Sequence, residues 1–111
     1  MSLDPIFDAL ADPTRRLLIE RLASGETVTA SGMAGELPMS RQAVAKHLSL
    51  LETAGLVTSD RVGREVRFSL EAAPLVDATR WMAAVGDAWD ARLGRLARLL
   101  TAEDAATAAD R

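Results

Sequence analysis

Hydrophobic positions in the first part of the chain recur at the spacing of amphipathic helices, and each run begins with a capping signal. Asp4-Pro5 and Asp12-Pro13 both place proline directly after an N-cap residue, which is a typical helix start. The pattern predicts a short helix from Asp4 through Leu10 and a second helix from Pro13 to about Ala23. The second helix is expected to bury Leu17, Leu18, Ile19 and Leu22.

Two further helices are predicted close together in the middle of the chain. Thr29 is a suitable N-cap for a small helix that reaches Leu37, and Ser40 is a suitable N-cap for a stronger helix from Arg41 to about Thr53. Pro38-Met39 forms the turn between them. The apolar stripe of the stronger helix repeats at steps of four and three residues, at Val44, Leu48 and Leu51.

After Gly55, which fits the left-handed position that ends a helix, the hydrophobic period changes to a loose alternation. The runs 56–62 and 65–70 flank Gly63-Arg64, so they predict a β-hairpin with a tight turn. Residues 26–28 could pair with it as a stub strand.

The last predicted helix opens at Pro74 and could reach Leu100. Residues 101–111 have no apolar stripe and are expected to form a flexible tail after a single domain of residues 1–100. The order of elements predicts a mainly α fold with a small β-hairpin (α+β). Its arrangement is a winged helix-turn-helix with a long C-terminal helix.

Composition narrows the possible chemistry. The 111-residue chain is 49% hydrophobic, has no cysteine and has one histidine. Disulfides, thiolate metal sites and thiol nucleophiles are therefore excluded, and no set of catalytic groups is visible, so we expect neither an enzyme nor a cofactor. No apolar run is long enough to span a bilayer and the N-terminal segment lacks basic residues, so the expected location is the cytoplasm.

Positive charge is concentrated in the middle of the chain, although the whole chain has a net charge of −3. Residues 38–68 hold five basic and three acidic side chains, and the rest holds eight basic and thirteen acidic ones. On the helix that starts at Arg41, polar and small residues share the face opposite the apolar stripe: Arg41, Gln42, Ala45, Lys46 and Ser49. Such side chains read base edges in a major groove, and Arg61 and Arg64 stand at the hairpin tip.

Four segments together resemble the ArsR family of bacterial winged-helix repressors. They are Leu10–Arg16, Met39–Leu48, Leu51–Val57 and the arginine-rich hairpin Arg61–Phe68. The resemblance implies a homodimer that binds a palindromic operator in double-stranded DNA and represses transcription. It implies DNA contacts from Ser40, Arg41, Gln42, Ala43, Ala45 and Lys46 in the groove and from Arg61 and Arg64 in the wing.

The chain departs from the metal-sensing members of that family, which carry cysteines near the short third helix or carboxylates and histidines on the last helix. Residues 27–33 contain no cysteine, and the last helix carries Asp77, Asp87 and Asp90 without histidine. We expect these carboxylates to pair with Arg80 and Arg92, with a hard-cation site as the alternative. The resemblance therefore predicts no metal site of the usual kind.

The last helix has a longer apolar stripe than its own domain is expected to cover, which favours self-association. The family resemblance implies pairing through the first and last helices. The predicted dimer interface consists of Ile6, Phe7, Leu10, Leu75, Met82, Val85, Trp89, Leu93 and Leu96. Packing within one protomer, or a pocket for an unknown small-molecule effector beside Trp81 and Trp89, are the alternatives.

Several side chains have two interpretations at this stage. His47 is either a DNA contact or pH sensor, or a partly buried residue that bonds to backbone. The hairpin arginines either contact DNA or protect an edge strand, and Arg67 could pair with Glu65 or Glu52. Arg15 and Arg16 contact phosphate, or pair with Glu20 or Asp12. A winged-helix module that binds another protein is the alternative function.

Overall fold

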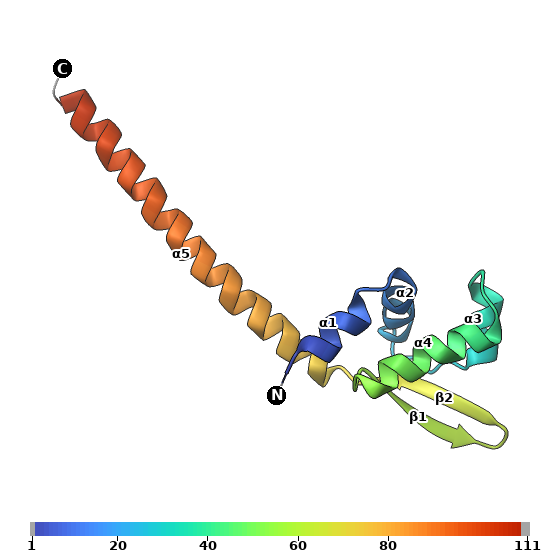
Figure 1. The fold of residues 1–111 in the computed structure, drawn as a ribbon. Coiled ribbons are helices and arrows are strands. Elements are labelled where there is room, and N and C mark those ends of the chain that lie inside the picture. Colours follow the sequence, from blue (N-terminus) through green and yellow to red (C-terminus); the bar gives the residue numbers. More distant parts are fainter. Residues whose placement is uncertain (1, 110–111) are drawn as a thin grey trace. The chain divides into compact units, whose positions relative to one another are not determined.

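The computed structural model describes the backbone of residues 2–109 and the side chains of residues 2–102. The chain divides into two compact units, residues 1–78 and residues 79–111. The first unit contains α1 (Asp4–Leu10), α2 (Pro13–Leu22), α3 (Ala30–Glu36), α4 (Arg41–Thr53), β1 (Val57–Val62) and β2 (Glu65–Leu70) (Figure 1). Helix α5 (Ala73–Ala109) begins in the first unit and makes up the second.

Side-chain caps fix three of the helix starts. Asp12, Thr29 and Ser40 each accept a hydrogen bond from the backbone N–H three residues on, at 3.0, 3.0 and 3.1 Å. Each such cap satisfies one of the free N–H groups of a first turn. The prediction that Asp4 caps α1 is wrong, because Asp4 lies within the helix and donates its own N–H to the Ser2 hydroxyl at 3.1 Å.

The core of the first unit forms where α4 packs against α2, α3 and β1 (Figure 1). Its largest fully buried side chains come from α2, from α4 and from the start of the hairpin: Leu18, Leu22, Val44, Leu48, Leu51, Leu56 and Val57. The predicted stripe of α4 is confirmed. Burying each such leucine contributes about 1.5–3 kcal/mol to the free energy of unfolding.

Helix α2 buries three of the four predicted side chains, Leu18, Ile19 and Leu22. The prediction for Leu17 is wrong, because this side chain is 51% exposed. At about 100° per residue the three buried positions share one face of the helix, and Leu17 falls on the other.

The two strands pair antiparallel, with Val57 opposite Leu70 and Val62 opposite Glu65. Gly63 occupies the turn with a φ of +65°, which a residue with a side chain rarely adopts. The predicted stub strand is reduced to one bridge, in which Val28 and Phe68 exchange backbone hydrogen bonds of 3.0 and 2.8 Å.

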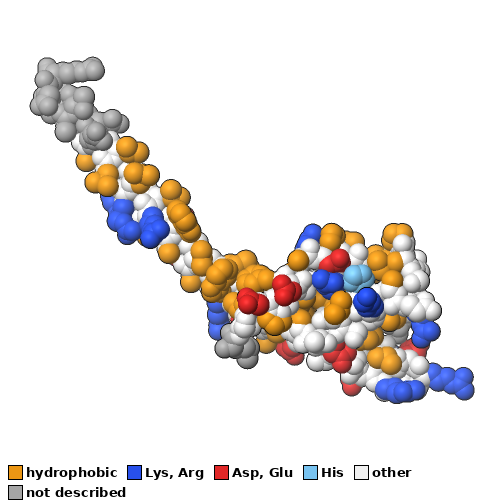
Figure 2. Space-filling model, viewed as in Figure 1, with side chains coloured by type: hydrophobic (Ala, Val, Ile, Leu, Met, Phe, Trp, Pro, Cys, Tyr) orange, Lys and Arg blue, Asp and Glu red, His pale blue; other side chains and the backbone are white. Residues whose placement is uncertain are grey.

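Helix α5 extends beyond the predicted end at Leu100, since its backbone is helical to Ala109. Alanine has the highest helix propensity, and residues 101–109 are rich in alanine. Hydrophobic side chains gather along α5 (Figure 2). Among the described residues, no helix has the length and apolar content needed to cross a membrane.

Candidate DNA-binding surface

Helix α4 presents two chemically distinct faces. Val44, Leu48 and Leu51 are fully buried in the core. The predicted groove residues Ser40, Arg41, Gln42, Ala45 and Lys46 are exposed, and Ala43 is half-buried. The polar face of this helix is therefore free to enter a DNA groove without disturbing the core.

The three arginines of the hairpin lie in different places, because successive side chains of a strand point to opposite faces of the sheet. Arg61 pairs across the sheet with Val66, on the face that also carries Phe68, and Arg64 lies in the turn. Arg67 lies on the opposite face, where its Nε donates to Glu65 Oε2 at 3.3 Å. Of the two partners predicted for Arg67, Glu65 and Glu52, the structure therefore supports Glu65. Lys and Arg side chains gather at the end of the hairpin (Figure 2).

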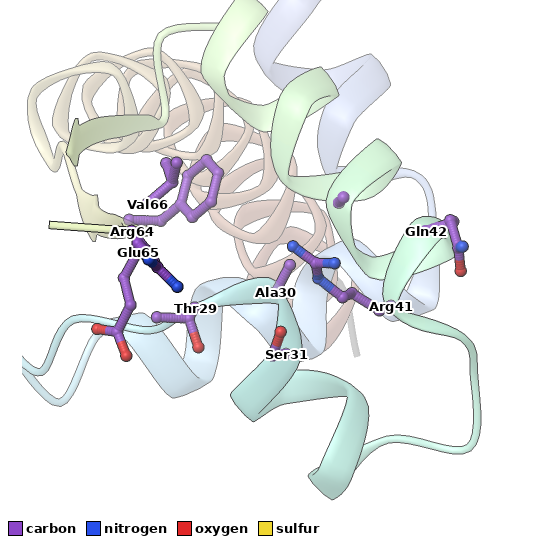
Figure 3. A pocket seen from close by; sticks show the side chains of 10 residues that line it. Thr29, Ala30, Ser31, Arg41, Gln42, Arg64, Glu65 and Val66 are labelled. Carbon is purple, nitrogen blue, oxygen red and sulfur yellow. The ribbon is translucent and has the colours of Figure 1, made fainter. Parts of the chain in front are cut away.

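A pocket of about 350 Å³ lies where α3, α4 and the hairpin meet (Figure 3). It brings together Arg41 at the start of α4 and Arg64 from the hairpin turn. The predicted residues Gln42 and Ala45 also line it. Two guanidinium groups beside one hollow suit a phosphate, because guanidinium donors match phosphate oxygens.

Six further residues that line this pocket, Ala30 and Phe68 among them, were not predicted as site residues. Thr29 and Ser31 bring hydroxyl groups from the start of α3, Glu65 adds a carboxylate, and Val66 contributes an apolar wall. The sequence placed Thr29 at a helix start, but it gave no signal that this start adjoins the hairpin.

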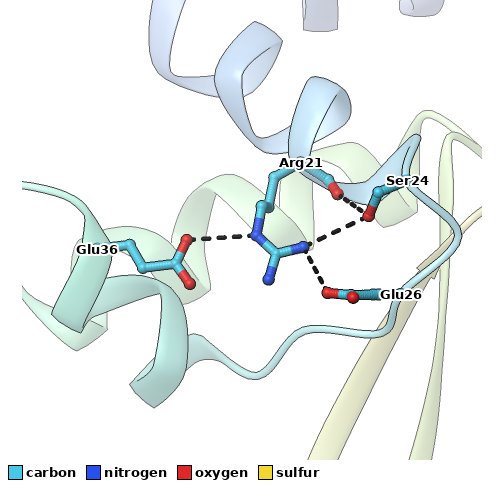
Figure 4. A network of polar contacts seen from close by, with 4 residues as sticks. All are labelled: Arg21, Ser24, Glu26 and Glu36. Atoms are coloured by element: carbon cyan, nitrogen blue, oxygen red, sulfur yellow. Dashed lines mark hydrogen bonds and ion pairs between the residues drawn. The ribbon is translucent and has the colours of Figure 1, made fainter.

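A network of polar contacts around Arg21 connects α2 with α3 (Figure 4). Arg21 Nη1 lies 3.0 Å from Glu26 Oε2, and its Nε lies 3.3 Å from Glu36 Oε2. The hydrogen bonds that Arg21 donates to Glu26 and Glu36 raise its pKa above the ordinary value. The network ties the last residue of α3 to the end of α2, which positions the first helix of the helix-turn-helix.

Arg15 and Arg16 bond to the C-terminal end of α1. Arg15 Nε donates to the carbonyl of Ala9 at 2.7 Å, and Arg16 Nη1 donates to the carbonyl of Leu10 at 2.7 Å. Neither predicted pairing, with Glu20 or with Asp12, occurs as an ion pair between these described side chains. Since the last carbonyls of a helix have no partner within it, these arginines act as a side-chain cap.

His47 lies next to the apolar stripe of α4 and is partly buried. Its side chain is 21% exposed, and its Nδ1 lies 3.9 Å from Asp12 Oδ2. The predicted bond to backbone is not observed, since Nδ1 is buried without a hydrogen-bond partner. The pKa of Asp12 is lowered, chiefly because the backbone N–H of Arg15 donates to its carboxylate.

The predicted interface residues on α5 are largely exposed. Trp89 and Leu93 are each 57% exposed, and Met82, Val85 and Leu96 are also exposed. Phe7, Leu10 and Leu75 are half-buried beside the core. Ile6 is only 6% exposed, so it belongs to the core of its own protomer and offers no surface to a partner.

The predicted ion pairs on α5 are not observed among the residues that the structure describes. Arg92 instead lies over the ring of Trp89, 5.7 Å from its centroid. Within the same part of the chain, no group of three or more histidine, aspartate or glutamate side chains could hold a metal ion.

The exposed helix after a tight turn, followed by a hairpin with arginines at its tip, defines a winged helix-turn-helix DNA-binding protein. A helix-turn-helix domain model matches residues 10–60. The transcriptional repressor SdpR of Bacillus subtilis is 31% identical over 80 residues, which cover 72% of this chain and 88% of that protein. A probable mercury resistance operon repressor of Streptomyces lividans is 36% identical over 100 residues, covering 90% of this chain and 67% of that protein.

Among solved structures, an ArsR-like transcriptional regulator from Rhodococcus sp. RHA1 superimposes with a TM-score of 0.80 at 39% identity. The match covers 90% of this chain and 91% of that one. The chain belongs to the ArsR family of helix-turn-helix transcriptional regulators. Members of this family are regulators and not enzymes, and they bind operator DNA, typically as dimers.

Proposed function

We propose that the chain is a homodimeric repressor that binds a palindromic operator, with α4 in the major groove and the hairpin on the flanking backbone or minor groove. The observation that supports this most is the meeting of Arg41 and Arg64 beside one pocket on the exposed side of α4. The proposed contacts are Ser40, Arg41, Gln42, Ala43, Ala45 and Lys46 in the groove, and Arg61 and Arg64 in the wing. The protein would act in the cytoplasm.

Dimer formation follows from the spacing of DNA grooves. Recognition helices enter successive major grooves on one side of B-DNA when they lie about 34 Å apart, and one protomer supplies only one such helix. The exposed apolar face of α5, together with Phe7 and Leu10, is the proposed interface. Its tryptophan at position 89 is of a type favoured at interface centres.

The proposed function is tested by selecting genomic DNA fragments with the purified protein and sequencing them. We expect one palindromic sequence, retarded by the protein at concentrations that leave unrelated DNA free. A protein that retards all sequences equally, or none, would favour the alternative of a protein-interaction module, which the net charge of −3 also fits.

Arg64→Ala is expected to weaken binding to all DNA sequences about equally. If Arg64 contacts a phosphate, its loss lowers the slope of log affinity against log salt concentration by about 1. Anisotropy titrations at several salt concentrations measure this slope. Arg67→Ala is the matched control, because Arg67 is bonded to Glu65 on the other face of the hairpin. A changed sequence preference with an unchanged slope would instead make Arg64 a base contact.

We propose that the protein does not sense thiophilic metals, since it has no cysteine and one histidine. Zinc at about 10 µM is expected neither to bind stoichiometrically nor to release operator DNA, because tight zinc sites use several thiolate or imidazole ligands. Calorimetry of the dimer and retardation assays with and without zinc check this. One tight site per subunit would contradict it, and the carboxylates of Asp77, Asp87 and Asp90 would then be replaced in turn.

A further inference from the structure

The imidazole of His47 has an unusual environment for a side chain on a recognition helix. Its Nδ1 is the one buried side-chain nitrogen or oxygen without a hydrogen-bond partner among the residues that the structure describes. Buried polar atoms are nearly always bonded, because an unbonded one retains the cost of losing water. The position of this nitrogen therefore requires an explanation.

The nearest acidic group is the carboxylate that caps α2. Asp12 Oδ2 accepts the N–H of Arg15 at 3.0 Å and lies 3.9 Å from His47 Nδ1. An unprotonated Nδ1 turns its lone pair toward that carboxylate, whereas a protonated imidazole presents an N–H to it. A charged imidazole can thus make a charge-assisted bond to Asp12 after a small movement, while its Nε2 keeps its own proton.

We propose that His47 is a positioning residue whose protonated imidazole binds Asp12, fixes α4 on α2, and makes operator binding take up a proton. This inference rests on the proposed function. Bound DNA places phosphates along the exposed face of α4, beside Lys46, and these anions stabilise a positive charge one residue away. DNA binding and proton binding then favour each other, as linkage requires.

The other charged groups near α4 do not take the place of Asp12. On α3, Glu36 is bonded to Arg21, and Asp60 of β1 does not come within 4.0 Å of the imidazole. On α2, the Arg15 side chain is bonded to carbonyls of α1. Because the pKa of Asp12 is lowered, its carboxylate stays charged at neutral pH and is available as a partner for the imidazole.

The test is operator affinity at pH 6 and pH 8, measured by fluorescence anisotropy at constant ionic strength with the operator that the protein selects. The chain has one histidine and no cysteine, and histidine is the side-chain type that ordinarily changes charge between these pH values. We expect binding about tenfold tighter at pH 6 than at pH 8, which lies within the usual range of coupling between two bound ligands. The N-terminal amine is present in every variant, so it cancels in the comparison.

Three variants show whether His47 acts through its protonation or has a structural role alone. His47→Gln is expected to bind with the same affinity at both pH values. Asp12→Asn keeps an oxygen that caps α2 but removes the negative charge, so it is expected to flatten the pH profile as well. Glu20→Gln neutralises an exposed carboxylate on the same helix and is expected to keep the tenfold difference.

The outcomes distinguish the two proposals. A wild-type protein that binds its operator equally well at both pH values overturns the role of His47 and leaves the repressor function standing. A pH profile that survives in His47→Gln overturns it too. A wild-type protein that binds no DNA sequence at either pH contradicts the proposed function itself. Thermal melting of each variant at both pH values shows whether a loss of affinity reflects unfolding.

Discussion

Trp89→Asp is expected to abolish dimer formation and operator binding together. Trp89 is 57% exposed in one protomer and lies within the apolar stripe of α5, which is the proposed interface. An aspartate buried there without a partner costs several kcal/mol of association free energy. Without a dimer the second recognition helix is missing, so affinity for a palindrome falls with it. Sedimentation velocity and retardation of the operator measure the two losses.

Ala91→Asp is the matched control for this change. Ala91 is exposed, and it lies two residues from Trp89 on the opposite side of the helix, at about 100° per residue. The control should sediment as a dimer and bind its operator normally. A wild-type chain that sediments as a monomer at micromolar concentration, yet binds its operator tightly, would contradict both the interface and the two-groove mechanism.

Lys46→Ala and Arg41→Ala are each expected to weaken operator binding by about 1–3 kcal/mol, as for the loss of a base contact or a well-ordered phosphate contact. Both side chains are exposed: Lys46 lies on the face of α4 opposite Val44 and Leu48, and Arg41 lies at the start of the helix. The free energy of unfolding should therefore stay close to that of the wild type. Anisotropy titrations and thermal melting test the two statements, and unchanged operator affinity in both variants would mean that the DNA-binding face is assigned wrongly.

The sequence was sufficient to predict the features that depend on neighbouring residues. The caps at Asp12, Thr29 and Ser40 involve residues three positions apart, and Gly63 marks the hairpin turn. The same local rules predicted the buried stripe of α4. The failure at Leu17 has a comparable origin, because three consecutive apolar positions in a helix, Leu17, Leu18 and Ile19, cannot all face one core.

The contacts that depend on packing between helices could not be predicted from the sequence. Arg21 reaches Glu36 across fifteen positions, and Arg64 meets Arg41 beside a pocket only because the hairpin folds back toward α4. The distance of 3.9 Å between His47 Nδ1 and Asp12 Oδ2 likewise depends on how α4 lies on α2. From side-chain type alone, such residues were predicted to contact DNA or to form ion pairs with residues close in the sequence.

The hydrogen bonds from Arg15 and Arg16 to the carbonyls of α1 affect how the results of a mutational survey of this protein should be interpreted. Replacing either arginine removes positive charge, and it also frees the end of α1 from α2. A reporter assay in cells would therefore score both positions as defective, alongside Arg41 and Lys46. A measurement of melting temperature separates the two groups. Replacing Arg15 or Arg16 is expected to lower the melting temperature, whereas replacing Arg41 or Lys46 is expected to leave it unchanged.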